Sequence, residues 1–143
     1  MKIRVKKLDE NAILPTYGTS FSAGADLYAL AGETIAPGET KLIHTGIAME
    51  IPEGYGGFLY ARSGLATKRG LAPANKVGVI DADYRGEIMV AMYNQSDKTQ
   101  SVDAGERVAQ LVIAPFLHAD FEESAELCDT QRGEGGFGST GKK

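Results

Sequence analysis

Short apolar runs separated by turn residues dominate the hydrophobic and polar pattern of this chain, and helical periodicity is scarce. Runs of this kind, rich in β-branched and aromatic residues and bounded by Gly, Pro, Asp and Ser, are typical of strands. The predicted strands are Ile3–Leu8, Ala25–Leu30, Thr40–Thr45, Ile47–Ile51, Gly57–Ala61, Lys76–Ile80, Glu87–Asn94 and Val108–Phe116. Many short strands at this spacing predict an all-β sandwich or barrel.

One short helix is expected among these strands. Ser63 suits the N-cap, Gly64–Arg69 would form barely two turns, and Gly70 suits the left-handed exit. The N-terminus of this helix would direct free N–H groups toward Arg62 and Ser63, which makes this corner a candidate anion site. The alternative is a plain capped helix with a surface arginine.

The chain is expected to form a single domain over residues 1–143. Its last apolar run, Val108–Phe116, is almost continuous, so both faces should be covered, by the core or by a partner subunit. The composition changes near Ser124, where a glycine-rich stretch begins to take over. Residues from about 124 to 143 are therefore expected to form a C-terminal arm that is mobile without ligand.

Composition and charge narrow the class of protein. The chain is 43% hydrophobic and 24% charged, as in soluble globular proteins, and its net charge of −4 disfavours binding to nucleic acid. No apolar run reaches membrane-spanning length, and the first residues lack a signal-peptide core, so no membrane association is expected. Cys128 is the single cysteine, which suits a reducing compartment. These features predict a cytoplasmic protein.

The end of the chain combines flexibility with groups that bind anions. Five glycines fall between Arg132 and Gly141, so the segment loses much backbone entropy on ordering, and Phe137 is its one aromatic. An arginine, two hydroxyls and unhindered N–H groups could clamp a polyphosphate under an aromatic lid; the alternative is a disordered polar tail. The near match of Gly136–Lys143 to a P-loop is rejected, because Lys143 replaces the Ser/Thr and no helix can follow.

Two acids and an aromatic residue follow the strand predicted at Lys76–Ile80. This strand and the one at Glu87–Asn94 are expected to pair as a β-hairpin with Asp81, Asp83 and Tyr84 at its tip. A carboxylate at the end of a rigid strand suits a general base, because its position is well fixed. The acids could instead bind a metal, or serve only as turn formers.

Further candidates for chemistry are weaker when each is taken alone. Asp26 could be an acid in the second shell of magnesium, and Gln110, three residues after Arg107, could donate to a phosphate. His44 and His118 have no Cys or acid at ligand spacing, so both are interpreted as structural or surface residues rather than zinc ligands.

Taken together, five stretches resemble, in order, the five signature motifs of the homotrimeric deoxyuridine triphosphatase (dUTPase) family. They are Ala23–Leu27, Arg62–Ala66, Gly78–Gly86, Gly105–Leu111 and Arg132–Gly141. The resemblance implies a jelly-roll-like β-barrel, a trimer with active sites shared between subunits, and an arm that reaches across to a neighbour. It implies hydrolysis of dUTP to dUMP and pyrophosphate, with Mg²⁺ on the triphosphate.

The resemblance also implies roles for residues at the nucleoside end of the substrate. Asp81 would be the base that activates water for attack on the α-phosphorus, and Tyr84 would pack against the deoxyribose, where a 2′-hydroxyl would clash. The uracil readers would be Asn75 and the backbone around Gly78 and Ile80.

Other motif residues are implied at the phosphates. The phosphate chain would meet Arg62, Ser63, Gly64 and Gln110, with Arg107 in support, and Asp26 would hold magnesium-bound waters. Phe137 of the arm would cover the uracil ring. The arm residues assigned to the substrate, chiefly at the γ-phosphate, are Arg132, Gly138, Ser139 and Thr140.

Two other functions are considered beside dUTP hydrolysis. A dCTP deaminase has a related fold and would release ammonia while leaving the triphosphate intact. A non-catalytic nucleotide-binding or regulatory module is the alternative from another class, although such a module would need no positioned base at Asp81.

Overall fold

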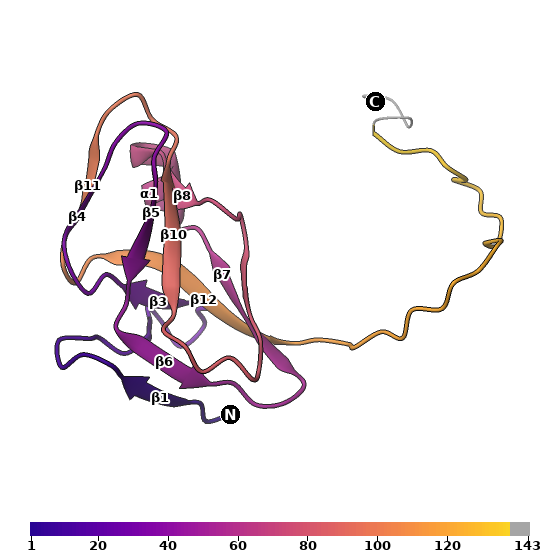
Figure 1. Ribbon diagram of the computed structural model, residues 1–143, viewed down its shortest axis with the longest axis horizontal. Coiled ribbons are helices and arrows are strands. Elements are labelled where there is room, and N and C mark those ends of the chain that lie inside the picture. The colour runs from indigo at the N-terminus through magenta and orange to yellow at the C-terminus, as the bar shows by residue number, and fades with distance from the viewer. Residues whose placement is uncertain (138–143) are drawn as a thin grey trace.

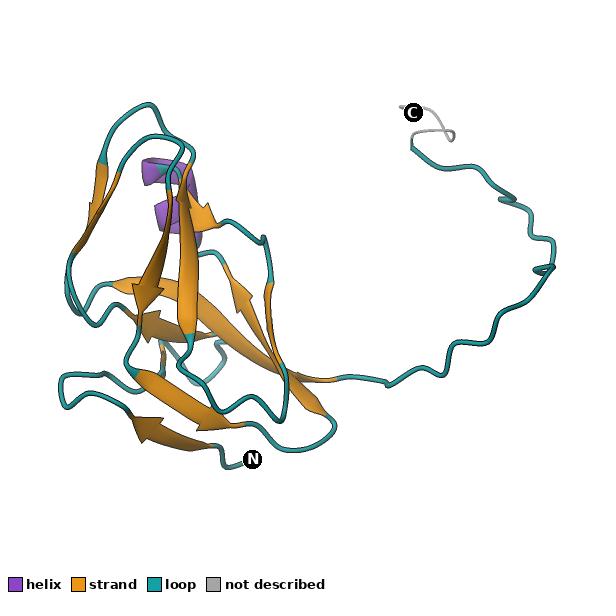
Figure 2. Cartoon of the chain, viewed as in Figure 1, coloured by secondary structure: helices purple, strands orange, loops and turns teal. Residues whose placement is uncertain are grey.

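The structure, a computed structural model, describes residues 1–137 of the chain. Strands dominate this part, with one short helix among them (Figures 1 and 2). The elements are β1 (Arg4–Lys7), β2 (Thr16–Tyr17), β3 (Ala25–Tyr28), β4 (Glu33–Ile35), β5 (Thr40–His44), β6 (Ile47–Glu50), β7 (Tyr55–Tyr60), α1 (Ser63–Arg69), β8 (Leu71–Pro73), β9 (Gly78–Ile80), β10 (Met89–Asn94), β11 (Gln100–Val102) and β12 (Arg107–Pro115). The all-β prediction, with one short helix, is confirmed.

The strands form one large antiparallel sheet and three smaller ones. The large sheet has the order β2-β3-β12-β7-β9, and a three-stranded sheet has the order β5-β10-β8. β1 pairs with β6, and β4 pairs with β11. Neighbouring strands are thus often distant in sequence, so the sheets bring together segments that no local pattern connects.

The last strand, β12, lies at the centre of the large sheet. It pairs with β3 on one side and β7 on the other, so that Gln110 lies opposite both Asp26 and Tyr60. Val108 and Leu111 are buried. The first half of this apolar run is therefore covered, as predicted, whereas Phe116, just beyond the strand, is exposed.

Two hydrophobic clusters make up the core. One is closed by α1, through its buried Leu65, and contains residues of β5, β10 and β12. The other contains Leu59 of β7, Ile80 of β9 and the neighbouring Ile88. Complete burial of one such side chain contributes about 1.5–3 kcal/mol, so the second cluster holds β7, β9 and the start of β10 firmly relative to one another.

All eight predicted strands are present, with ends shifted by at most two residues. Four additional strands were not predicted: β2, β4, β8 and β11, which have two or three residues each. Strands this short show no recognisable alternation, because alternation needs four or more residues to be visible. Their partners in space, not their own sequences, make them strands.

The predicted N-cap of the helix is wrong by one residue. Arg62 is the N-cap, with extended φ and ψ of −88° and 126°, and Ser63 is the first helical residue. The Arg62 carbonyl already accepts a hydrogen bond from the Ala66 N–H at 3.0 Å, so the helix begins one residue earlier than expected. Gly70 ends the helix in the left-handed conformation, with φ of 67°, as predicted.

The chain leaves the barrel after β12. Residues 116–137 contain no helix or strand and extend away from the sheets (Figure 1). This segment therefore begins well before the change of composition near Ser124. Within residues 1–137, no helix is long and apolar enough to cross a membrane.

Candidate active site

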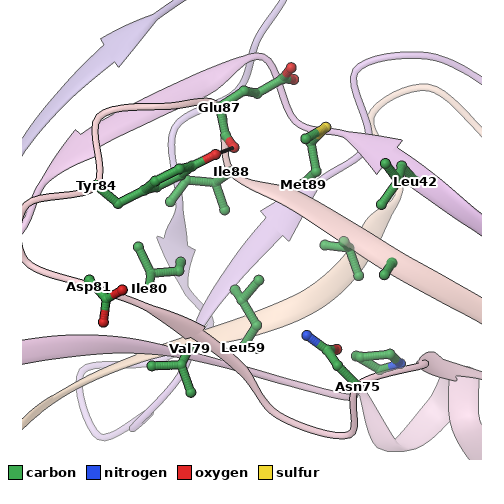
Figure 3. A pocket seen from close by; sticks show the side chains of 14 residues that line it. Leu42, Leu59, Asn75, Val79, Ile80, Asp81, Tyr84, Glu87, Ile88 and Met89 are labelled. Carbon is green, nitrogen blue, oxygen red and sulfur yellow. Dashed lines mark hydrogen bonds between the residues drawn. The ribbon is translucent and has the colours of Figure 1, made fainter.

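A cavity of about 300 Å³ lies between β9 and the segment that leads into β10 (Figure 3). Apolar side chains from both sides form most of its wall, and a few polar groups converge on it, as is usual in ligand pockets. The lining residues are Leu42, Leu59, Pro73, Asn75, Gly78, Val79, Ile80, Asp81, Tyr84, Glu87, Ile88, Met89, Val90 and Ala91. The cavity thus contains five of the residues predicted for the nucleoside, namely Asn75, Gly78, Ile80, Asp81 and Tyr84, but not Phe137.

The predicted β-hairpin is wrong, and this explains the cavity. β9 pairs with β7, whereas β10 pairs with β5 and β8. The two strands belong to different sheets, so they diverge after the turn at residues 81–88 instead of closing on each other. The divergence leaves room for a ligand between them, which a paired hairpin would not.

Asp81 and Tyr84 stand at one end of the cavity. Asp81 directly follows the buried Ile80, so the core fixes its backbone while its side chain remains exposed. The Tyr84 N–H donates to the Asp81 carbonyl at 3.2 Å, and the Tyr84 hydroxyl donates to the Glu87 carbonyl at 2.9 Å (Figure 3). The turn therefore places a carboxylate and an aromatic ring at the same opening.

Asn75 stands at the opposite end, on a strained turn. The Val77 N–H donates to the Asn75 carbonyl at 2.7 Å, and Lys76 between them has a φ of +65°. A side chain at Gly78 would lie 3.3 Å from Asn75 Nδ2 and 3.2 Å from Leu59 Cβ, so glycine lets the amide lie across β9. Backbone strain of this kind concentrates at functional sites.

A second cluster brings two arginines onto one acid. The Asp26 carboxylate accepts from Arg62 Nε at 2.8 Å and from Arg107 Nη1 at 3.3 Å, and the Asp26 side chain is only 11% exposed. Arg62 also reaches the Arg107 carbonyl through Nη1 at 3.4 Å. Two guanidinium groups around one carboxylate leave a net positive charge, which suits a phosphate ligand.

Gln110 lies beside this cluster, against a glycine. A Cβ at Gly24 would come within 2.8 Å of Gln110 Oε1 and 3.0 Å of its Cβ. Gln110 and Asp26 face each other on β12 and β3. The structure therefore places the predicted phosphate residues of three separate motifs at one end of the large sheet.

The nucleoside cavity and this cationic cluster do not meet within one chain. The residues that line the cavity include neither arginine of the cluster, nor Asp26, nor Gln110. Ser63 and Gly64 lie at the exposed start of α1, beside Arg62. The residues predicted for the nucleoside and those predicted for the phosphates thus lie at two different places in a single chain.

Comparison with known proteins identifies the family of this chain. The dUTPase family model matches residues 10–141. The chain belongs to the dUTPase family. The deoxyuridine 5′-triphosphate nucleotidohydrolase of Nautilia profundicola is 50% identical over 142 residues, which cover 99% of this chain and all of the relative. The enzyme of that name from a Hydrogenobaculum species is 51% identical over 144 residues and covers both chains completely.

Solved structures agree with the family. The dUTPase of Staphylococcus bacteriophage 80alpha with dUpNHpp has a TM-score of 0.91 and 31% identity, covering 98% of each chain. A mutant dUTPase of phage phi11 of S. aureus, described with a structural Mg(II) ion, has a TM-score of 0.79 and 28% identity, covering 88% of this chain and 98% of that one. The distorted, jelly-roll-like barrel of this dUTPase is therefore that of its family.

The described part of the arm, up to Phe137, extends away from the sheets that carry the cavity and the arginine cluster (Figure 1). Arg132 Nε donates to the Gly135 carbonyl at 2.8 Å, and the Phe137 side chain is fully exposed. The remaining arm residues predicted to bind substrate, Gly138, Ser139 and Thr140, lie outside the described residues.

Among the polar residues that line the cavity, Glu87 was not predicted as a site residue. The Glu87 carboxylate accepts from the Gly46 N–H at 2.8 Å and lies 2.9 Å from His44 Nδ1, and Glu87 lines the cavity. The sequence shows Glu87 only as the first residue of an expected strand. No local signal connects it to Gly46, which lies 41 positions earlier.

Proposed function

We propose that this chain hydrolyses dUTP to dUMP and pyrophosphate with Asp81 as the general base. The reaction follows from the family, because full-length relatives at about 50% identity are deoxyuridine 5′-triphosphate nucleotidohydrolases. The protein is accordingly a dUTP diphosphatase. The same relatives favour this reaction over dCTP deamination. The observation that carries the residue roles is the cavity, where Asp81, Tyr84 and Asn75 converge.

In the proposed reaction, Asp81 accepts a proton from a water molecule at the mouth of the cavity. The water oxygen forms a bond to the α-phosphorus as the bond from that phosphorus to the bridging oxygen breaks, and pyrophosphate leaves. Asp81 suits this step because it is exposed to water yet follows the buried Ile80, which fixes its position.

The uracil would lie toward Asn75 and the backbone of Gly78 and Ile80. Uracil and cytosine differ in the donors and acceptors on their edge, so a buried backbone that pairs with one leaves groups unpaired against the other. Tyr84 would pack against the deoxyribose. The narrow space above Gly78, where even a Cβ would contact Leu59 and Asn75, supports a tight fit to a planar base.

The phosphates would bind at the second cluster. Arg62, with Ser63 and Gly64 at the start of α1, and Gln110 would contact the phosphate chain, and Arg107 would support it. Arginine forks supply positive charge where it is needed in a protein of net charge −4. Asp26 holds both arginines in place for this task.

The residues present fit a magnesium ion that arrives with the triphosphate. The described part of the chain contains no group of three or more His, Cys, Asp or Glu side chains that could bind a metal directly. Magnesium keeps several waters, and a carboxylate that accepts two N–H bonds retains lone pairs for such a water. Asp26 would hold these waters. Bound magnesium would neutralise charge on the leaving pyrophosphate.

We also propose that residues 1–143 form one domain and that the chain acts as a homotrimer, the state characteristic of the family. Separation of the cavity from the arginine cluster within one chain supports sites shared between subunits. The segment after β12 carries exposed apolar side chains that a neighbour could cover, namely Leu117, Phe121, Leu127 and Phe137. Phe137 would close over the uracil, and Arg132, with Gly138, Ser139 and Thr140, would hold the γ-phosphate end.

We also propose a cytoplasmic location for the protein. Cys128 would stay reduced in that compartment.

One assay tests the reaction and its base. Pyrophosphate release is measured on dUTP, UTP, dCTP and dTTP, together with ammonia release from dCTP. We expect rapid turnover of dUTP alone, loss of turnover by about 10³-fold or more in Asp81→Asn with binding retained, and little change in the control Asp83→Asn, which lies outside the cavity. Near-normal turnover in Asp81→Asn would remove Asp81 from the base role.

A mixing experiment tests the shared sites. Asp81→Asn and Arg62→Gln subunits are each expected to be nearly inactive, but a random equimolar mixture of the two would regain activity in roughly a quarter of all its sites, because about one site in each mixed trimer would combine two intact halves. The absence of any recovery in mixed trimers would show that each site is built from one subunit.

Deletion of residues 132–143 tests the role of the arm. The truncated chain should form a folded oligomer that hydrolyses dUTP poorly. Full activity of the truncated chain would contradict the role of the arm.

A further inference from the structure

Tyr84 is fixed at the cavity by contacts within the turn at residues 81–88. Its hydroxyl donates to the Glu87 carbonyl at 2.9 Å (Figure 3). Its ring lies so close to Gly86 that a Cβ there would overlap the phenol. The orientation of the ring therefore depends on where the backbone of Glu87 stands.

The backbone of Glu87 is in turn held by its own side chain. The carboxylate points away from Tyr84 (Figure 3) and accepts from the Gly46 N–H at 2.8 Å, and its other oxygen lies 2.9 Å from His44 Nδ1. Gly46 has a φ of +69°, a left-handed conformation that glycine adopts freely. Because an ionised carboxylate only accepts hydrogen bonds, Nδ1 of His44 carries the proton in this contact.

Hydrogen bonding outweighs burial at this carboxylate. Partial burial raises the pKa of Glu87, but the hydrogen bonds from His44 and the Gly46 N–H lower it by more. The pKa of Glu87 therefore lies below its ordinary value. Glu87 is therefore anionic at neutral pH, and hydrogen bonds to an ionised acceptor are the stronger kind. The next residue adds two more bonds to the same corner, from Thr45 Oγ1 to the Ile88 carbonyl at 2.5 Å and from the Ile88 N–H to the Ile47 carbonyl at 2.8 Å.

We propose that Glu87 is a positioning residue for sugar specificity: its carboxylate, held by Gly46 and His44, keeps Tyr84 where it excludes a 2′-hydroxyl. This inference rests on the proposed function, which places the deoxyribose against Tyr84. Steric exclusion of a single hydroxyl requires that the side chain in its way cannot move. A tyrosine ring without its hydrogen bond can change rotamer at small cost, so Tyr84 needs its bond to the Glu87 carbonyl to exclude the hydroxyl. Glu87 acts through Tyr84 and does not touch the substrate itself.

The test is the ratio of kcat/KM for dUTP to that for UTP, measured by pyrophosphate release. Glu87→Ala should lower this ratio about tenfold, as expected for loss of a charge-assisted anchor. In Glu87→Gln the ratio should lie between those of Glu87→Ala and the wild type, because the amide oxygen still accepts from the Gly46 N–H. The matched control is Glu33→Ala, which removes a carboxylate of similar exposure from the Lys41 pair outside the cavity and should leave the ratio unchanged. A Glu87→Ala enzyme that loses stability or turnover on both nucleotides equally, with the ratio intact, overturns the inference.

Two variants of Tyr84 separate this inference from the proposed function. Tyr84→Ala should lower the ratio strongly; an unchanged ratio would overturn the sugar role of Tyr84, and the inference with it. If Tyr84→Ala lowers the ratio but Glu87→Ala does not, the inference alone is wrong. Should Glu87→Ala fail to fold, Tyr84→Phe decides, since it keeps the ring and loses the bond to the Glu87 carbonyl. A lowered ratio in Tyr84→Phe and in Glu87→Gln supports the inference, and unchanged ratios in both overturn it.

Discussion

The Arg62 guanidinium donates to the Asp26 carboxylate at 2.8 Å, across 36 positions of sequence. Asp26 is buried on β3, between β2 and β12 of the large sheet, and Arg107 shares it through the other oxygen. One acid therefore orients two cations and reduces their mutual repulsion. This arrangement gives Asp26 a role in stability as well as in substrate binding.

Replacing Asp26 by Asn should reduce both the stability of the protein and its binding of substrate. The variant keeps the shape of the side chain but leaves two partly buried guanidinium groups without a counter-charge, so we expect the free energy of unfolding to fall by about 1–3 kcal/mol. KM for dUTP should rise at the same time. Urea denaturation and steady-state kinetics check these effects, with Asp120→Asn in the exposed segment after β12 as the control. Unchanged stability would show that the arginines are satisfied by solvent.

Gly24→Ala should disturb Gln110 in particular. The new methyl would lie 2.8 Å from Gln110 Oε1 and 3.0 Å from its Cβ, and the Cβ cannot move without shifting β12. Overpacking of this kind costs about 1–3 kcal/mol, and we expect a higher KM with the Asp81 chemistry intact. Gly18→Ala is the control, because the nearest atom to its Cβ would be Ser22 Oγ at 3.6 Å. Equal KM values for the two variants would contradict this account.

Lys76 carries the strain of the turn beside Asn75. Its φ of +65° is costly for a side chain and more so for a β-branched one. We expect Lys76→Val to lower the free energy of unfolding by about 1 kcal/mol, whereas Lys76→Gly should match or exceed the wild type, since relief of strain offsets the greater entropy of the unfolded glycine. Thermal denaturation of the three proteins ranks them. A valine variant as stable as the wild type would mean that the turn relaxes in solution.

Glu87 should make stability depend on pH in the acid range. Its folded pKa lies below its ordinary value of 4.5, so its contribution is complete above that value and is lost as the pH falls through the folded pKa. The stability difference between the wild type and Glu87→Gln should therefore shrink from about pH 5 downward. Denaturation curves from neutral pH into the acid range measure it. A difference that grows on acidification would contradict the direction of the shift.

The sequence by itself determined the longer strands, the helix and the five motifs. Alternation and turn residues act over a few neighbours, so β5, β10 and β12 were predictable from their own residues, as was the left-handed Gly70 at the end of α1. The motif residues also showed which chemistry the chain carries. Each of these signals is local, and each can therefore be read along the chain.

Only the tertiary structure decided which segments meet. It placed β9 and β10 in different sheets, which opened the cavity that a hairpin would have closed. It brought Arg107 to Asp26 across 81 positions and Glu87 to Gly46 across 41. Such contacts depend on the path of the whole chain and on burial shared among distant strands, and no local pattern of residues contains that information.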